Sequence, residues 1–258
     1  MEKNEKQDHL LSSVTNALRI LRSFSMEQPE LRVSDLAVSL GLSKSTVSRL
    51  LATLAHEDFV VKSPETNRFR LGLSVLALSG AATSNLEIHR EAQHILFELV
   101  KELGETAHIC VLEGMDTLYL HKVECKHPVR ILTHYGKRNP AYCTSSGKVL
   151  LAYQSKEFIE KMLENGLKSV TKYTTTNPDE FRENLKTIRE QGFAYSKNEL
   201  LEGVVSIAAP VRDYSGKVVA AITVVGPAER IQPYKIRPYA KKIISASLEI
   251  SDRLGFWR

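Results

Sequence analysis

The sequence predicts an α+β protein: an N-terminal winged helix-turn-helix domain, a helical linker, and a second domain with an antiparallel sheet flanked by helices. Three short helical patterns followed by a basic hairpin predict the first domain. After residue 104, strand-like and helical segments alternate, and hairpin turns such as Asp213-Tyr214-Ser215-Gly216 favour antiparallel pairing. We place the winged domain at residues 10–72, the linker at 73–86 and the second domain at 87–258.

The composition is that of a globular protein, with 43% apolar and 25% charged residues. The net charge of +5 suits a polyanionic partner, but local charge is more informative, since Lys44 and Arg49 lie in a tract with no acid before Glu57. Three cysteines without a CxxC pair predict a reducing cytoplasm and no disulfide framework. The polar first six residues are unlike a signal peptide, and the longest apolar runs, 73–82 and 218–226, are too short to cross a bilayer. We therefore expect no membrane partner.

The first two helices are predicted from apolar spacing and from their end signals. One face of the first helix is expected to carry Val14, Ala17, Leu18, Leu21 and Phe24. Pro29 interrupts the pattern. The second helix is expected to begin at Ser34 as N-cap, with Val33 and Val38 packed together across its start, and to end at Gly41.

The third helix, over residues 42–54, is the most informative segment. With Ser43 as N-cap, the inward face is formed by Val47, Leu50, Leu51 and Leu54. The free face then consists only of hydrogen-bond donors and positive charge, provided by Lys44, Ser45, Thr46, Ser48, Arg49 and Thr53. Such a face suits the major groove of double-stranded DNA, although a solvated helix face is the alternative. The candidate DNA contacts are Ser43, Lys44, Ser45, Thr46, Ser48 and Arg49, with Arg49 expected on a guanine or a phosphate.

A basic hairpin directly follows the third helix and favours the DNA interpretation. The segments 59–62 and 68–71 are expected to be strands, and 63–67 the turn between them. Arg68 and Arg70 are two residues apart, so both are expected on one face of the strand, where they can contact phosphate or the minor groove.

The second domain is expected to begin with an amphipathic helix. Its apolar stripe is a candidate dimerisation surface and is formed by Ile88, Ala92, Ile95, Leu96, Leu99 and Leu103. Strands are expected at 106–112, 117–123, 129–134, 205–211 and 218–225. Helices are expected at 145–153, 156–164, 178–191 and 233–253.

Motifs in both halves of the chain resemble the IclR family of bacterial transcriptional regulators. In the first half they are Leu36-Ala37, residues 41–54 and Arg68-Phe69-Arg70-Leu71-Gly72. In the second half they are Gly104-Glu105-Thr106, residues 136–140, Ser146-Gly147-Lys148, Gln191-Gly192-Phe193, Gly203, residues 207–211 and Gly226-Pro227. The resemblance implies a winged-helix DNA-binding domain and a GAF-like effector domain. It also implies a homodimer or homotetramer on operator DNA, with a small organic acid or aromatic catabolite as effector.

The effector site is expected around residues 143–148. Thr144 or Ser145 is expected to cap the following helix, whose free N–H groups and positive dipole end suit a carboxylate. A simple helix cap is the alternative. The segment is not a phosphate-binding P-loop, because the leading glycine is missing and Val149 follows Lys148.

The resemblance also indicates further pocket residues. Ser196, Ser206 and Thr223 match polar pocket-lining positions of the family, and hydroxyls here replace the acid or thiol of some members. Ile131, Tyr135 and Val204 would supply apolar walls, although Tyr135 could equally be part of the core. The candidate ligand-binding residues are Ile131, Tyr135, Cys143, Ser145, Ser146, Ser196, Val204, Ser206 and Thr223.

Metal binding and catalysis are not expected. His108 and Cys110 share one strand face, as a metal pair requires, but His121, Cys125 and His127 do not complete an evident ligand set. No nucleophile–base pair can be nominated. We therefore expect an effector-controlled DNA-binding regulator without cofactor. An architectural DNA-binding protein without effector, or an enzyme using the second domain, are the alternatives.

Overall fold

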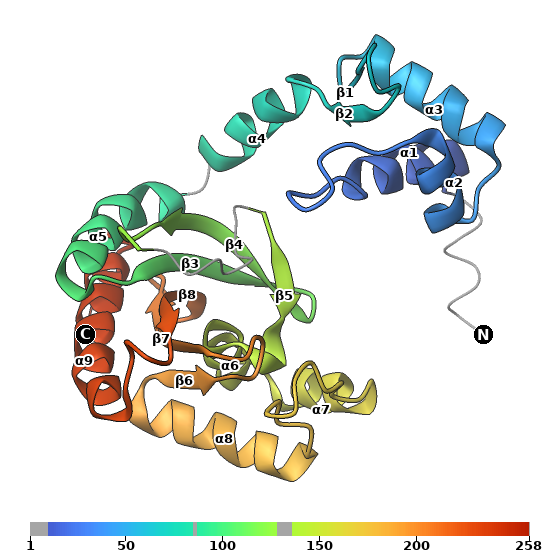
Figure 1. The fold of residues 1–258 in the computed structure, drawn as a ribbon. Helices are drawn as coiled ribbons and strands as arrows, with labels where there is room; N and C mark the ends of the chain where they lie inside the picture. Colours follow the sequence, from blue (N-terminus) through green and yellow to red (C-terminus); the bar gives the residue numbers. More distant parts are fainter. Residues whose placement is uncertain (1–9, 85–86, 128–135, 258) are drawn as a thin grey trace. The chain divides into compact units, whose positions relative to one another are not determined.

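A computed structural model describes residues 10–84, 87–127 and 136–257. The chain divides into two compact units, with the boundary between Asn85 and Leu86 (Figure 1). Each unit is described separately.

The N-terminal unit consists of helices packed with a two-stranded wing. Its elements are α1 (Ser12–Arg22), α2 (Val33–Leu40), α3 (Lys44–His56), β1 (Val60–Lys62), β2 (Phe69–Leu71) and α4 (Ser74–Ser84). The buried centre includes Ile20, Leu36, Val47 and Leu51. Phe69 is buried beneath the wing, and its backbone pairs with Leu31 ahead of α2. The wing is therefore joined to the three helices, as the sequence predicted for a winged helix-turn-helix.

Two sequence-based details of these helices are wrong. The inward face of α1 is formed by Ala17, Ile20, Leu21 and Phe24, whereas Val14 and Leu18 are each about half exposed. The fully buried Ile20, which the prediction omitted, sets the rotation of the helix.

The start of α2 also differs from the prediction. The helix begins two residues earlier than expected, because Arg32 is its N-cap instead of Ser34. Asp35 closes the first turn by accepting a hydrogen bond from the backbone N–H of Arg32 at 3.3 Å. Val38 is 83% exposed and forms no contact of the expected kind with Val33. At the other end, Gly41 adopts the left-handed conformation that terminates α2, as expected.

The C-terminal unit is built on a six-stranded antiparallel sheet in the order β5-β4-β3-β8-β7-β6. Its strands are β3 (Thr106–Glu113), β4 (Asp116–Val123), β5 (Arg138–Pro140), β6 (Ala194–Lys197), β7 (Val204–Arg212) and β8 (Val218–Pro227). Four of the five predicted strands are confirmed within two residues at each end. The fifth, 129–134, lies outside the described residues. The short strands β5 and β6 were not predicted.

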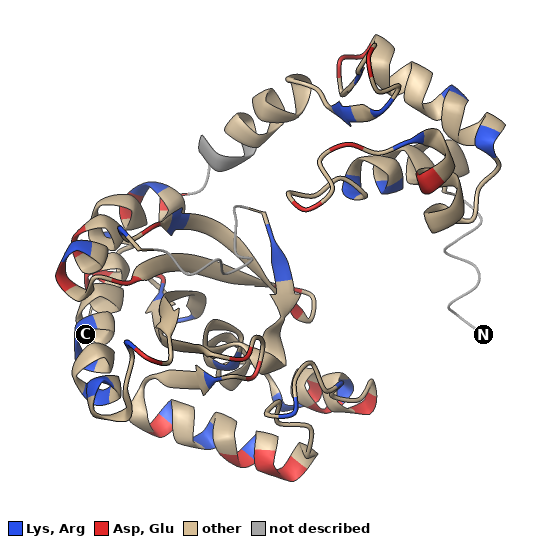
Figure 2. Ribbon diagram, in the orientation of Figure 1, with Lys and Arg blue, Asp and Glu red and all other residues tan. Residues whose placement is uncertain are grey.

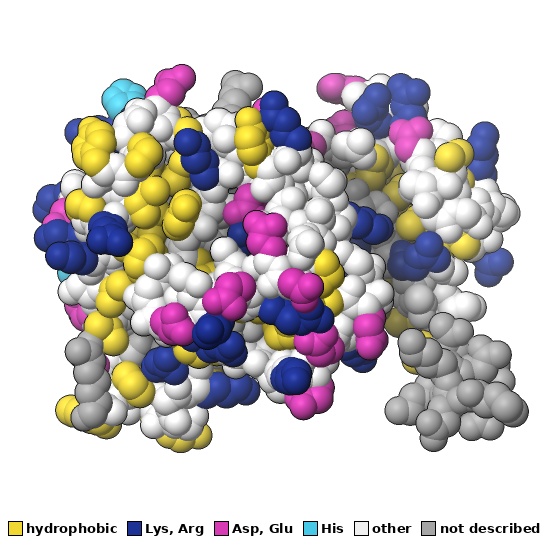
Figure 3. All heavy atoms as spheres, turned by 90° about the horizontal axis from the view of Figure 1, so that it is seen from below, with side chains coloured by type: hydrophobic (Ala, Val, Ile, Leu, Met, Phe, Trp, Pro, Cys, Tyr) yellow, Lys and Arg dark blue, Asp and Glu magenta, His cyan; other side chains and the backbone are white. Residues whose placement is uncertain are grey.

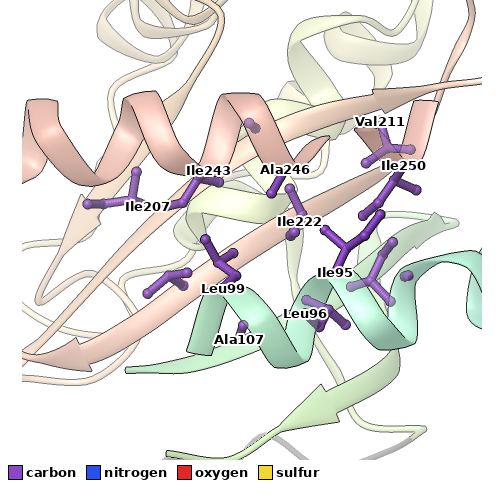
Figure 4. Close-up of a cluster of buried hydrophobic side chains, with 14 of the residues drawn as sticks. Ile95, Leu96, Leu99, Ala107, Ile207, Val211, Ile222, Ile243, Ala246 and Ile250 are labelled. Carbon is purple, nitrogen blue, oxygen red and sulfur yellow. The ribbon is translucent and has the colours of Figure 1, made fainter. Parts of the chain in front are cut away.

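Helices cover both faces of this sheet. They are α5 (Glu87–Leu103), α6 (Ser145–Ala152), α7 (Lys156–Glu164), α8 (Pro178–Gln191) and α9 (Pro233–Arg253), with a 3-10 turn at Ala141–Cys143 before α6. Against one face, α5 and α9 enclose a core that includes Leu96, Ile207, Ile222 and Ile243 (Figure 4). The other face carries α6 and α8, whose core includes Phe181. The apolar stripe expected on α5 therefore packs mainly within its own unit and not against a partner. Its residues Ile88, Ala92, Ile95, Leu96 and Leu99 are all buried.

Candidate DNA-binding and ligand-binding sites

The third helix presents the predicted donor face. Ser43 caps α3 by accepting a hydrogen bond from the backbone N–H of Thr46 at 3.1 Å. Val47, Leu51 and Leu54 are buried. The opposite side is exposed at Ser43, Lys44, Ser45, Thr46, Ser48, Arg49 and Thr53. No acidic side chain within the described parts of the chain forms an ion pair with Lys44 or Arg49, so both charges are available to a phosphate.

A groove that the sequence did not indicate lies beside this face. The start of α1 contributes Ser12, Ser13 and Asn16, which face Thr46, Arg49, Leu50 and Thr53 of α3. The groove is therefore lined by hydroxyl, amide and guanidinium groups without an acid. Since the start of α1 carries no periodic signal of its own, only the packing of α1 on α3 brings these groups together.

The wing supplies further positive charge. Arg70 is exposed and Arg68 is half-buried, and they flank the buried Phe69, which agrees with the expected alternation. Lys62, opposite Phe69 in the register, places its ammonium 5.9 Å from the centre of that ring. Lys and Arg thus occur on both α3 and the hairpin (Figure 2).

In the C-terminal unit, the sequence-predicted ligand residues surround one pocket of about 450 Å³, its open mouth included. Seven of the nine candidates line it, namely Cys143, Ser145, Ser146, Ser196, Val204, Ser206 and Thr223. The other two, Ile131 and Tyr135, lie outside the described residues. The wall also contains His108, Tyr119, Thr144, Glu199, Leu200, Leu201 and Val225, which had not been nominated as ligand contacts.

The polar groups of this pocket are held in place by the start of α6. Thr144, rather than Ser145, is the cap, because its hydroxyl accepts a hydrogen bond from the N–H of Gly147 at 3.0 Å. The Ser145 hydroxyl donates to Ser206 on β7 at 2.8 Å. Thr223 on β8 is 4% exposed, and its hydroxyl has no hydrogen-bond partner among the described residues. A buried hydroxyl of this kind costs free energy unless a ligand or water completes it.

The ionisable groups of the pocket wall are uncharged near neutral pH. Burial, assisted by the nearby charge of Lys122, lowers the pKa of His108 to about 3, so the imidazole is neutral. The His108 ring packs edge-on against Tyr119, with 5.2 Å between the ring centres. Burial likewise raises the pKa of the Cys143 thiol to about 12, which keeps it protonated and a poor nucleophile.

One ion pair is the exception. The Lys148 ammonium on α6 donates to both carboxylate oxygens of Glu199, each at 2.6 Å, and the two residues are only 1% and 8% exposed. Lys148 lies beside three apolar residues, Val149, Leu150 and Leu151, on a helix that is buried along its whole length. A lysine within an apolar helix indicates a buried acidic partner, but nothing in the sequence shows that this partner is Glu199.

Gly147 lets α6 approach the preceding turn. A methyl group there would overlap the backbone of Ala141, so we expect Gly147→Ala to destabilise the C-terminal unit by about 2 kcal/mol or more. Gly80 in α4 is the control, because nothing lies near its missing Cβ and alanine there should stabilise by about 0.5–1 kcal/mol. Urea unfolding followed by circular dichroism measures both effects. A fully stable Gly147→Ala variant would contradict this packing.

The histidines and cysteines considered as metal ligands do not form a metal-binding cluster in the described structure. Within residues 10–84, 87–127 and 136–257, no three His, Cys, Asp or Glu side chains form a group that could hold a metal ion. Burial raises the pKa of the Cys110 thiol to about 12, which opposes the thiolate that zinc requires. His121 instead packs edge-on against His89, with 4.9 Å between ring centres.

The two units match two family models in the order the fold suggests. Residues 13–64 match the IclR helix-turn-helix domain, and residues 80–252 match the C-terminal domain of bacterial IclR regulators. The chain belongs to the IclR family. Members of this family are DNA-binding transcriptional regulators, and the relatives found are named as regulators rather than enzymes.

Individual relatives align with almost the whole length of this chain. The transcriptional regulator KdgR of Escherichia coli K12 is 31% identical over 253 residues, which cover 98% of this chain and 96% of KdgR. The crystal structure of an IclR regulator from Alicyclobacillus acidocaldarius superposes with a TM-score of 0.85 at 27% identity, covering 96% of this chain and 100% of that one. An IclR homologue from Microbacterium hydrocarbonoxydans, solved with 4-hydroxybenzoate, has a TM-score of 0.85 at 23% identity, with coverages of 94% and 99%, and supports the fold alone.

Among the described residues, no helix is both long enough and apolar enough to cross a bilayer.

Proposed function

We propose that this regulator binds a small hydroxylated carboxylate in the pocket at the start of α6, and that the bound effector controls its affinity for operator DNA. The observation that carries the proposal is the pocket itself: hydroxyls surround the N-terminus of a helix, and the carboxylate on the described wall, Glu199, is paired with Lys148. The N–H groups of Ser145 and Ser146 precede the first intrahelical hydrogen bonds, so they can donate to a carboxylate. Ser196, Ser206 and Thr223 then offer hydroxyls to the rest of the ligand.

The apolar residues of the pocket indicate what kind of effector fits. The wall of the pocket also includes the apolar side chains of Leu200, Leu201, Val204 and Val225. Val225 on β8 pairs with Ser206 on β7, so apolar and hydroxyl groups lie side by side, and a compact ligand with both kinds of surface fits. The Microbacterium homologue was solved with 4-hydroxybenzoate, which also combines a carboxylate, a hydroxyl and an apolar body. In this chain, the hydroxyl-rich wall favours a ligand with several hydroxyl groups.

On DNA, we propose that α3 enters the major groove. Arg49 and Lys44 supply charge, while Ser43, Ser45, Thr46 and Ser48 donate hydrogen bonds to base edges or phosphates. Arg68 and Arg70 of the wing contact phosphate or the minor groove. Two copies of the chain bind the two halves of a palindromic operator, because a two-fold protein matches a two-fold site. Effector binding shifts the population between DNA-competent and DNA-incompetent arrangements.

A thermal-shift panel of carboxylates, aldonic acids and hydroxybenzoates, followed by gel-shift titration on the upstream DNA of its own gene, tests the proposal. We expect at least one acid to raise the melting temperature and to change the operator affinity. If none of them changes either quantity, an architectural DNA-binding protein without effector is favoured instead. Loss of a compound by turnover, followed by mass spectrometry, would favour an enzyme.

Thr223→Val separates a ligand contact from a structural role. The substitution keeps the shape and removes a hydroxyl that has no partner among the described residues, so folding stability should be unchanged or slightly higher. Effector affinity should fall roughly 3- to 10-fold, the equivalent of about 1 kcal/mol for one hydrogen bond.

Thr117→Val is the matched control. The Thr117 hydroxyl donates to the carbonyl of Asn139 at 3.1 Å, so this change should cost about 1 kcal/mol of stability without altering effector affinity. Calorimetric titration and urea unfolding measure both. Equal effector affinity in Thr223→Val and the wild type would contradict the ligand contact.

A further inference from the structure

A second cleft lies on the side of the Lys148–Glu199 pair that faces α8, and we call it the α8 cleft. It encloses about 980 Å³, its open mouth included, and is larger than the effector pocket. Lys148 and Glu199 border it from α6 and from the chain after β6, Asn184 from α8, and Tyr195 and Lys197 from β6. Glu199 borders both cavities, whereas Lys148 borders only the α8 cleft.

Two polar groups at the cleft each lack one hydrogen-bond partner among the described residues. Lys148 has three ammonium hydrogens, of which two bind Glu199, and no residue in the described ranges accepts the third. The side-chain oxygen of Asn184 is buried and has no donor among the same residues. One group therefore needs an acceptor and the other a donor, and a small ligand that carries both satisfies them together.

The charge around the cleft favours an anion. Among the described residues that line the cleft, Glu199 is the only acid, and it is already paired with Lys148. Lys197 is exposed at the rim, and the Lys172 ammonium lies 5.1 Å from the ring centre of Tyr173, another rim residue. The outer surface of α8 pairs its charges locally, with Arg182 bound to Glu160 and Lys186 to Glu183, and this side of the unit shows both signs intermixed (Figure 3). Among the described residues, Lys172 and Lys197 form no ion pair with an acid, so positive charge near the mouth of the cleft is available to an anion.

We infer that the α8 cleft is a second binding site, which takes a small anion bearing hydroxyl groups. Its anionic group accepts from Lys148 and Lys197, and one hydroxyl donates to Asn184. Tyr173 and Tyr195, each about half exposed, also line the cleft and supply flat aromatic surface. The site is distinct from the effector pocket, and Glu199 borders both cavities.

The test is calorimetric and thermal-shift titration of the full chain with gluconate and with glycerol 3-phosphate. Both probes are hydroxylated anions. The anionic group is a carboxylate in gluconate and a phosphate in glycerol 3-phosphate. Sodium sulfate at the same ionic strength controls for nonspecific charge. We expect one of the two probes to bind, and Asn184→Leu and Lys197→Glu each to weaken that binding by roughly 5-fold or more.

Matched variants make the assignment specific. Lys186→Glu makes the same charge change on α8 away from the cleft and should leave probe affinity unchanged. Thr223→Val alters only the effector pocket and should also leave it unchanged, so failure of the effector proposal is distinguishable. The inference is overturned if neither probe binds the wild type, if sulfate reproduces the effect, or if Asn184→Leu and Lys197→Glu bind as the wild type does.

Discussion

Operator affinity is expected to fall roughly 5- to 150-fold when Arg49 is replaced by alanine, the equivalent of about 1–3 kcal/mol. Arg49 is exposed near the start of α3, its charge is not neutralised by an acid of the described chain, and it also borders the groove beside α1. A guanidinium can bind guanine or phosphate through two parallel hydrogen bonds, a planar geometry that no other side chain on that face of α3 has. Gel-shift titration against the operator, at a fixed salt concentration, measures the loss.

Arg237→Ala is the matched control for this substitution. Arg237 is exposed on α9 in the other unit, so its replacement removes the same charge without touching the proposed DNA face. Its effect on operator affinity should be small. If Arg49→Ala and Arg237→Ala reduce binding equally, the contribution of Arg49 is general electrostatics rather than contact. If neither reduces it, α3 does not use Arg49 to bind DNA.

The largest effect on stability is expected from Lys148→Met. This change leaves the Glu199 carboxylate buried without its only side-chain partner in the described structure, at a cost of roughly 3–5 kcal/mol. Because the charge alone is responsible, the double variant Lys148→Met with Glu199→Leu should recover most of the lost stability. Urea unfolding followed by circular dichroism compares the three proteins.

Two results would contradict this account of the ion pair. A single Lys148→Met variant as stable as the wild type would show that Glu199 is neutral or hydrated. A double variant no more stable than the single one would show that Lys148 acts through packing of its aliphatic chain. Lys156→Met, at the exposed start of α7, is the control and should change stability by less than about 0.5 kcal/mol.

The sequence predicted the elements with strong periodicity and clear ends. The helices α7, α8 and α9 agree with their expected bounds, because a Ser, an Asn and a Pro mark their starts. The strands β5 and β6 could not be predicted, since each has only three or four residues and gains its conformation from pairing with a neighbour. The error in α1 has a similar cause. Its sequence has more apolar residues than one face can bury, and packing within the unit selects the face that contains Ile20.

The candidate pocket was predictable only in part. Residues that stand on regular elements, such as Ser145, Ser206 and Thr223, followed from a helix start or from a strand pattern combined with the family resemblance. Glu199, Leu200 and Leu201 come from the connection between β6 and β7, which has no periodicity to indicate where its side chains lie. His108 and Tyr119 were visible in the sequence, but their placement on adjacent strands around the pocket depends on the register of β3 and β4.

The alternation of β7 and β8 has an evolutionary consequence. Ser206 and Thr223 face the pocket, whereas their neighbours Ile207, Ile222 and Val224 are buried in the core on the opposite face, against α5 and α9. A substitution at position 206 or 223 therefore changes what the pocket can bind without altering the packing behind it. Mutation and selection can exchange one metabolite specificity for another at these two positions while the scaffold stays intact. A single fold can thereby diversify into sensors of chemically different compounds.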